Sequence, residues 1–305
     1  MLALCCSWPA HAVQEPAAAP REILRPAAPA VAVAVAGTGP APAGRECTLR
    51  VADPAEAAAA RPGDVVCFTG ELADRRLVLR HGGRAGAPIT YSGRGTVVAG
   101  ITVEADHVVV EGFRAERPQA PGVELTGEDL TLRDTLVLEP RGGDGDGIRF
   151  FGRDLRILGN TVRGTHNTGS RHADCVQTFA DGTPPSQDVL IQGNRCEEVD
   201  NMCLMAEGPN DGEGDGHGTT ARFTLRDNYC DTRDASQALM FEDVRQVTVT
   251  GNTFPTPLHH AIGLALHSTG AHVGENTYHP GIGYEVGIDS SSRPGYQGPP
   301  PGGAP

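Results

Sequence analysis

A short motif recurs seven times along the chain and constrains its fold more than any other feature. Each copy is a run of β-favouring residues that ends near Gly, Asp or Asn, as in HVVVEGF (107–113), VLIQGNR (189–195) and VTVTGNT (247–253). A period of about 23 residues, lengthened twice by an insertion, indicates a solenoid of stacked coils. The aligned positions are Gly112, Asp134, Asn160, Asn194, Asn228, Asn252 and Asn276, with spacings of 22, 26, 34, 34, 24 and 24.

A second family of short strands precedes the first in each repeat, as in CVQTFA (175–180), CLMAEG (203–208) and ALMFED (238–243). One such strand cannot bury a face alone, but stacked coils bury a continuous core. Leucine-rich repeats share the period, but their Leu/Asn consensus and helical half are missing. We therefore predict an all-β fold, a single right-handed parallel β-helix over residues 45–289. The recurring Asn should line one corner, because Asn tolerates the left-handed backbone of a sharp turn.

The two ends of the chain differ from this middle part. Residues 1–12 end in an Ala-x-Ala pattern typical of a signal peptide, here short at its start, and predict a secreted, extracellular protein. The segments 13–44, an Ala/Pro-rich linker, and 290–305, a Gly/Pro-rich tail, have the composition of disordered chain, and we predict that both are disordered. The longest apolar run, 30–36, is far below the ~20 residues of a membrane helix, so no membrane span is expected.

The charge of the chain excludes one large class of partner. Acidic residues number 38 and basic residues 25, a net charge of −13, and every basic residue is Arg. A chain this acidic and without Lys is a poor ligand for a phosphate backbone, so nucleic acid is not expected as a partner. We expect a monomer.

Six cysteines follow the signal peptide, and an even number in an exported chain predicts disulfides. Two of them lie two residues after a turn Asn, and two others share the first position of the second strand family. Neighbouring coils lie ~4.8 Å apart, within the Cα separation of ~4.4–6.8 Å that a disulfide needs. The alternative is that the first two are stacked core thiols. The expected pairs are Cys47–Cys67 at the N-terminal cap, Cys175–Cys203 and Cys196–Cys230.

Two insertions, 163–173 and 209–220, interrupt neighbouring coils and mark the candidate site, because solenoid loops gather on the binding face. Strand alternation points polar and aromatic side chains outward between these loops. Such a surface suits a sugar polymer lying along the sheet. The expected catalytic residues are His172, Asp174, Arg171 and Glu207, and the expected substrate-binding residues are Arg149, Gln177, Asn201, Phe179 and His166.

Carboxylates on successive coils suggest two further uses. Asp146 occupies the position of Asp174 one coil earlier, which places their carboxylates ~5 Å apart. With Asp200 they are our candidate Ca²⁺ ligands, since Ca²⁺ takes several oxygen ligands. Paired carboxylates at this separation also serve glycosidases. The acidic loop 211–215 has a similar composition, but we interpret it as a solvated loop.

The N-terminal part of the repeat region carries a family resemblance. ADPAEAAAARPGDVVCFTG (52–70), APITYSGRGTVVAG (87–100) and HVVVEGF resemble the opening of the pectate-lyase-like β-helix superfamily, chiefly the chondroitinase-B-like and alginate polysaccharide lyases. The resemblance implies a secreted enzyme that acts on an acidic polysaccharide. Those lyases share a Lys/Arg base–acid pair, and this chain has no Lys. That mechanism therefore cannot be carried over residue for residue, and the base would be His172, our first candidate, or an Arg.

Three functions remain open on the sequence. The first is a polysaccharide lyase that cleaves a uronate-containing glycan by β-elimination, with Ca²⁺ or Arg, Gln and Asn donors neutralising the uronate. The second is a glycoside hydrolase that uses two of Asp146, Asp174, Asp200 and Glu207. The third is a non-catalytic, carbohydrate-binding or surface solenoid. Product mass separates the first two, because only hydrolysis adds water.

Overall fold

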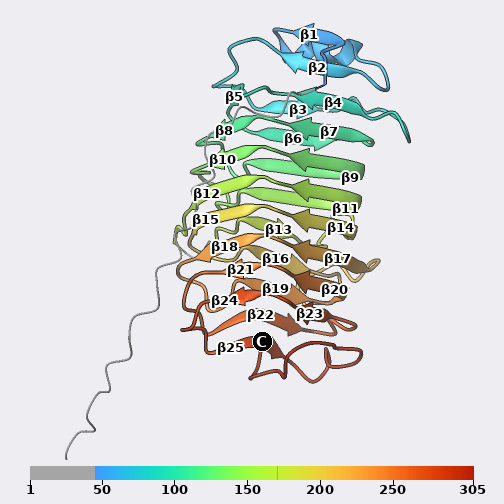
Figure 1. Cartoon of the computed structure of the whole chain (residues 1–305). Helices are drawn as coiled ribbons and strands as arrows, with labels where there is room; N and C mark the ends of the chain where they lie inside the picture. The colour runs from blue at the N-terminus through green and yellow to red at the C-terminus, as the bar shows by residue number, and fades with distance from the viewer. Residues whose placement is uncertain (1–44, 170) are drawn as a thin grey trace, which may run out of the picture. The chain divides into compact units, whose positions relative to one another are not determined.

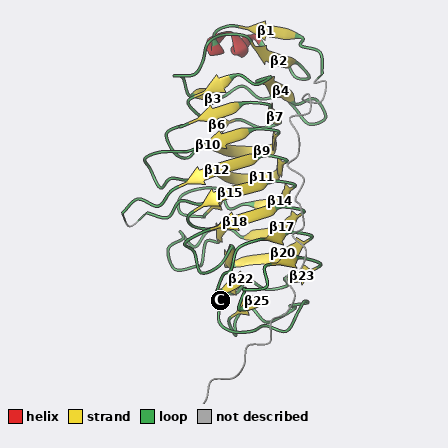
Figure 2. Cartoon of the chain, turned by 60° about the vertical axis from the view of Figure 1, so that its left-hand side comes forward, coloured by secondary structure: helices red, strands yellow, loops and turns green. Residues whose placement is uncertain are grey.

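The computed structural model describes residues 45–169 and 171–305, and these residues form a parallel β-helix, as the repeat predicts (Figures 1 and 2). Strands of successive coils pair in parallel, for example Leu155 with Val189 and Val189 with Phe223. The predicted signal peptide and linker, 1–12 and 13–44, lie outside the described residues. Within the described part of the chain, no helix has the length and apolar character of a membrane span.

The coils stack three ladders of strands, two of which share the long strands β9 and β11. The site ladder contains β3 (Leu77–Leu79), β6 (Ile101–Glu104), β9 (Val123–Arg133), β11 (Ile148–Leu158), β13 (Val176–Thr178), β16 (Leu204–Glu207), β19 (Leu239–Glu242), β22 (His260–Ala265) and β25 (Tyr284–Ile288). The second ladder contains β1 (Leu49–Val51), β2 (Val65–Phe68), β4 (Ile89–Ser92), β7 (Val108–Glu111), β9, β11, β14 (Gln187–Gln192), β17 (Thr220–Arg226), β20 (Val244–Thr250) and β23 (His272–Gly274). The third ladder contains β5 (Val97–Val98), β8 (Arg114–Glu116), β10 (Leu136–Leu138), β12 (Thr161–Thr165), β15 (Arg195–Val199), β18 (Tyr229–Thr232), β21 (Thr253–Phe254) and β24 (Thr277–Tyr278).

Apolar side chains at equal positions on successive coils fill the interior. In the site ladder, Ile148 pairs with Val176, Val176 with Leu204, and Leu204 with Leu239, and all four are buried. Each buried side chain of this size stabilises the fold by about 1.5–3 kcal/mol. Neighbouring residues of the same strands then point outward, so the predicted inward and outward directions are confirmed here.

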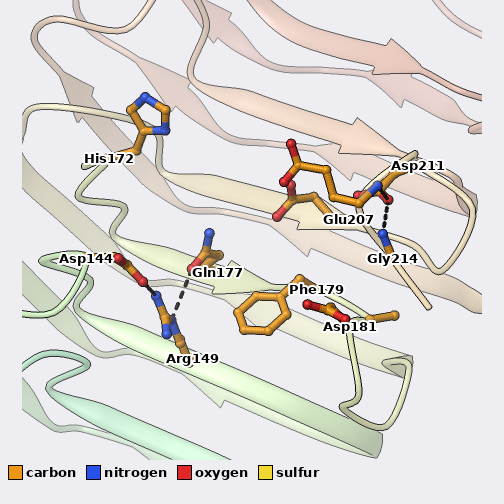
Figure 3. Close-up of a pocket in the computed structure, with 11 residues that line it drawn as sticks. Asp144, Arg149, His172, Gln177, Phe179, Asp181, Glu207, Asp211 and Gly214 are labelled. Atoms are coloured by element: carbon orange, nitrogen blue, oxygen red, sulfur yellow. Dashed lines mark hydrogen bonds and ion pairs between the residues drawn. The ribbon is translucent and has the colours of Figure 1, made fainter. Parts of the chain in front are cut away.

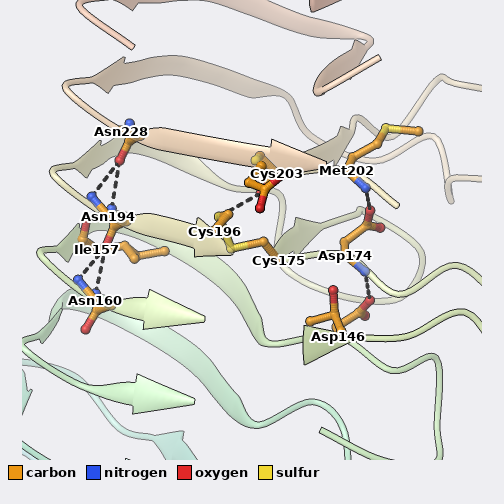
Figure 4. Close-up of a disulfide and its surroundings, with 12 residues drawn as sticks. Asp146, Ile157, Asn160, Asp174, Cys175, Asn194, Cys196, Met202, Cys203 and Asn228 are labelled. Carbon is orange, nitrogen blue, oxygen red and sulfur yellow. Dashed lines mark hydrogen bonds between the residues drawn. A yellow bond between two sulfur atoms is a disulfide. The ribbon is translucent and has the colours of Figure 1, made fainter. Parts of the chain in front are cut away.

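The recurring asparagines form a hydrogen-bonded ladder at one corner, as predicted (Figure 4). The Asn194 Oδ1 atom accepts both the backbone N–H of Asn160, at 2.8 Å, and its side-chain amide, at 3.0 Å. The same two bonds link Asn194 to Asn228. They continue through Asn252 to Asn276. Each amide thus satisfies buried backbone groups that the turn leaves without a strand partner.

A short 3₁₀ helix, η1 (Pro54–Ala59), lies beside β1 at the N-terminal end of the described coils (Figure 2). Asp53 caps it by accepting the N–H of Ala55 at 2.8 Å. The predicted Cys47–Cys67 disulfide is present, with 5.7 Å between its Cα atoms. It joins the chain just before β1 to the next coil, so this end of the core is closed covalently.

The other two predicted disulfides are wrong, although the register behind them is correct. Cys196 lies beside Cys230 on the next coil, as expected. The bond, however, joins Cys175 to Cys196, with 5.8 Å between their Cα atoms (Figure 4), and leaves Cys203 and Cys230 as buried thiols. Equal positions on parallel neighbours point the same way at strand spacing, whereas a disulfide needs Cβ atoms ~3.5–4.5 Å apart that face each other. Residues facing each other across the interior meet this requirement.

The C-terminal tail, 290–305, also differs from the prediction, because it packs on the last coils. Gln297 forms a parallel bridge with His272, and Gly303 forms one with Gly287. Ser292 is fully buried and accepts the N–H of Ser268. A Gly/Pro-rich segment can pack closely against neighbouring backbone in tight turns, or it can be disordered. Composition alone does not distinguish these two outcomes.

Candidate functional site

The candidate site lies on the outer face of the site ladder, between the two predicted insertions. The first insertion separates β12 from β13 and the second separates β16 from β17. Successive strands place Arg149 beside Gln177, and Gln177 beside Met205, in one outward column. The next column pairs Glu207 with Glu242. These columns therefore run across successive coils, as the alternation pattern predicts.

A pocket of about 260 Å³ opens on this face, and we call it the groove (Figure 3). Figure 3 shows His172 on one side of Gln177, with Glu207 and Asp211 on the other. Acidic side chains outnumber basic ones in its lining. The lining residues are Asp144, Arg149, His172, Gln177, Phe179, Ala180, Asp181, Glu207, Asp211, Glu213 and Gly214.

Arg149 is the one guanidinium in the lining of the groove, and its position is fixed on several sides. Its Nε donates to Asp146 at 2.7 Å and to Gln177 at 3.0 Å, and it forms an ion pair with Asp144. Its guanidinium carbon lies 5.4 Å from the centre of the Phe179 ring, within cation–π range. Two carboxylates already compensate its charge, so the groove as a whole keeps a strongly negative potential.

Three carboxylates converge at one end of the groove, from Glu207 and Asp211 of its lining and from Glu242 on the next coil, and we call them the carboxylate cluster. One oxygen of each lies within 4.8 Å of the others. Burial, reinforced by Asp211, raises the pKa of Glu207 to about 7, and burial also raises the pKa of Glu242. Ca²⁺ takes about six to eight oxygen ligands in proteins, so three carboxylates would supply part of its shell and water or a substrate the rest. Because the negative charge of the cluster is uncompensated, these residues fit a divalent cation.

Our predicted Ca²⁺ ligands do not form such a group. Asp146 is buried, and its two oxygens already accept from Arg149 and from the backbone N–H of Asp174. Asp174 accepts from Asn201 and from the N–H of Met202 (Figure 4). Burial raises its pKa well above the usual value, and Asp146 beside it raises it further. Among the described residues, three possible metal ligands converge in the carboxylate cluster. Asp200 belongs neither to this cluster nor to the pair of Asp146 and Asp174.

Several other predicted site residues lie away from the groove. His166 lies in a separate pocket, and its Nδ1 is 3.4 Å from an Asp200 carboxylate oxygen. Arg171 is exposed and donates to the Gly143 carbonyl. Asn201 is buried against Asp174. The structure thus brings together five predicted residues, Arg149, His172, Gln177, Phe179 and Glu207.

Sequence reasoning missed the partners of Glu207. Strand alternation in the sequence already places Glu242 in the outward column of Glu207, one coil later, but we did not count it among the site residues. Asp211 lies in the acidic loop that we interpreted as solvated, but its side chain is half-buried against the groove. The loop turns back because the Asp211 carboxylate accepts the N–H groups of Glu213 and Gly214, at 2.8 and 2.7 Å.

Comparison with known proteins gives matches at the level of three-dimensional structure. No family model and no curated protein matches the sequence. The PL6 family alginate lyase AlyGC matches with a TM-score of 0.46 and 12% identity, over 78% of this chain and 40% of that one. An alginate lyase from Paenibacillus sp. str. FPU-7 matches with a TM-score of 0.38 and 13% identity, over 79% of this chain and 99% of that one. The chain thus spans less than half the length of AlyGC, and residue roles here rest on its own geometry.

Proposed function

We propose that the protein is an extracellular polysaccharide lyase that holds a uronate-containing glycan in the groove with the help of Ca²⁺ and cleaves it by β-elimination. The observation that carries the proposal is the carboxylate cluster, placed across the groove from an exposed histidine. A groove this acidic repels a polyanion unless a cation lies between them. Two disulfides are typical of a protein that works in an oxidising, extracellular environment.

Glu207, Asp211 and Glu242 would hold the cation. The bound Ca²⁺ would neutralise the uronate carboxylate, which makes the adjacent C–H acidic enough to lose its proton. Before binding, burial keeps Glu207 partly protonated near neutral pH. Cation binding should therefore release protons, and binding should strengthen as pH rises through 7.

His172 is the base of the proposed reaction. Its imidazole is exposed in the groove, on the side of Gln177 that faces away from the cluster (Figure 3). A neutral histidine can take up a proton near physiological pH, whereas Arg149 cannot, because a guanidinium stays protonated. His172 would take the proton at the α-carbon of the uronate, and the leaving glycosidic oxygen would gain a proton from water or from the imidazolium.

The floor of the groove would orient the sugar. The Gln177 amide supplies a donor to sugar hydroxyls while its oxygen accepts from Arg149. Phe179 is half-buried, and its ring packs edge-on against Phe151 with centroids 4.9 Å apart. A ring held in this way offers an apolar surface to the face of a pyranose without losing rotational freedom on binding.

A panel of uronate-containing and neutral polysaccharides tests the proposal, read by product mass and ultraviolet absorbance. We expect unsaturated products without added water, formed only from uronates, and loss of activity with a Ca²⁺ chelator. Binding of a uronate polymer without turnover would instead support a non-catalytic solenoid and would overturn the proposal.

One observation favours a second candidate, a retaining glycoside hydrolase. Glu207, with its pKa raised to about 7, would be the general acid, and Glu242 at ≤ 4.8 Å would be the nucleophile, close to the ~5–5.5 Å of retaining enzymes. The two candidates predict opposite effects of Ca²⁺. A cation on these carboxylates would support the lyase but would block a hydrolase, whose products would also carry one added water.

A further inference from the structure

Three aromatic side chains that the proposed reaction does not use meet at the C-terminal end of the site ladder. His260 begins β22 and pairs with Tyr284 of β25 in strand register. Their rings are stacked with centroids 5.2 Å apart, and the His259 ring stands edge-on to both. His260 is only 2% exposed, whereas His259 is exposed. None of the three lines the groove.

The polar atoms of these rings converge at short distances. The Nδ1 atoms of His259 and His260 are 3.1 Å apart, and the Tyr284 hydroxyl is 3.3 Å from His259 Nδ1. That hydroxyl donates its single proton to the Ala304 carbonyl at 2.7 Å, so it can only accept from His259. In the described residues, no carboxylate hydrogen-bonds to either imidazole.

No arrangement of protons satisfies this group. If His259 Nδ1 carries the proton, it can donate to Tyr284 and to His260 Nδ1, but His260 must then carry its proton on Nε2, which is buried without a partner. If His260 Nδ1 carries the proton and donates to His259, two lone pairs face each other at 3.3 Å between His259 and Tyr284. His260 Nε2 is then a buried acceptor without a donor.

We propose that His259 Nδ1 and His260 Nδ1 form a two-nitrogen binding site for a borderline transition-metal ion, of the Cu²⁺ and Zn²⁺ class. Ligands ~2.0–2.1 Å from such an ion lie about 2.9–3.4 Å from one another, which matches the 3.1 Å between the two nitrogens. The ion would replace the proton between these two facing lone pairs, while the Tyr284 hydroxyl keeps its bond to Ala304.

The chemistry of the ligands separates this site from the carboxylate cluster. Two neutral imidazole nitrogens suit Cu²⁺ best and Zn²⁺ or Ni²⁺ next, whereas Ca²⁺ prefers charged oxygen ligands. Tyr284, whose ring stacks on His260, connects this site to β25 and, through Ala304, to the C-terminal segment.

Titration of the full chain with Cu²⁺, without an affinity tag and with excess Ca²⁺ present, tests the proposal. We expect one high-affinity Cu²⁺ per chain, two nitrogen couplings in its electron paramagnetic resonance spectrum, and a rise in thermal midpoint on binding. His259→Ala should weaken this binding at least about tenfold, since loss of an outer-shell partner alone costs 10–100-fold. His259 is exposed, so this variant should fold normally without metal.

His272→Ala is the matched control, because His272 is an exposed strand histidine outside the cluster. It should leave the Cu²⁺ affinity unchanged. Equal affinities of the wild type and His259→Ala, or an equal loss in His272→Ala, would overturn the proposal. A spectrum with a single nitrogen ligand would overturn it too, and would leave the two imidazoles as a hydrogen-bonded pair.

Discussion

Replacing Glu207 by Gln should stabilise the protein at pH 8 and have almost no effect at pH 4. Burial and the neighbouring Asp211 raise the pKa of Glu207 from 4.5 to about 7. Between these pH values the folded state holds more protons than the unfolded chain, so the free energy of unfolding falls as pH rises through this window. At about 1.4 kcal/mol per pH unit, the ionised glutamate costs up to about 3 kcal/mol above pH 7. Gln removes this cost and keeps the shape.

Urea denaturation followed by far-ultraviolet circular dichroism at both pH values measures the difference. Glu71→Gln is the control, because Glu71 is exposed and is not among the charges that raise the pKa of Glu207, and it should change stability little at either pH. Ca²⁺ at 100 times its dissociation constant should add about 2.7 kcal/mol to the wild type at pH 8 and much less to Glu207→Gln. Equal effects of Glu207→Gln at pH 4 and pH 8 would refute the electrostatic reasoning.

Three further outcomes are expected. His172→Ala should lower kcat by ~10²–10⁴ on the uronate substrate without moving the thermal midpoint, because His172 is exposed; a lower midpoint would make it a packing residue. Cys203 and Cys230 should react with an alkylating agent only after unfolding, as read by mass spectrometry, since both are buried; labelling of the folded protein would contradict their burial. Asn194→Ala should lower the unfolding free energy by about 2–4 kcal/mol in urea, because it leaves two donors of Asn160 without an acceptor; a neutral effect would show that water replaces the amide.

The fold could be predicted because each repeat shows the same pattern of alternating strand residues followed by a turn residue. The position of Asn194 relative to Asn160 and Asn228 fixed the corner, and strand alternation then fixed which side chains point inward. Burial of Val176 and Leu204 beneath the half-buried Gln177 follows directly from that register. Any single strand would have been ambiguous, but seven aligned copies left one consistent arrangement.

The prediction of the site succeeded mainly where strands position the side chains, although His172, in the first insertion, also reaches the groove. Arg149, Gln177 and Glu207 lie in strands, and they meet in the groove as expected. His166 lies beyond the end of β12, and the insertion turns it toward Asp200 instead. The conformation of such loops depends on hydrogen bonds such as those to Asp211, and a repeat pattern contains no information about them.

The pairing of the cysteines shows a second limit. Coil register gives the neighbours of a residue along the stack, and it correctly places Cys196 beside Cys230. It does not give the residue opposite in the same coil, because that depends on how far apart two ladders lie. Cys175 precedes β13 and Cys196 lies in β15 of the same coil, and the two ladders bring their Cα atoms to 5.8 Å at this point.

The asparagine ladder makes the stacking of the coils independent of the length of the loops between them. Each rung has the same hydrogen-bond geometry whether 24 or 34 residues lie between successive asparagines. The extra residues are accommodated in the loops around the groove, and the stacking of the coils is unaffected. Loop length and sequence can therefore diverge without loss of the scaffold, so new ligand preferences could arise, or be engineered, by exchange of 163–173 and 209–220 alone.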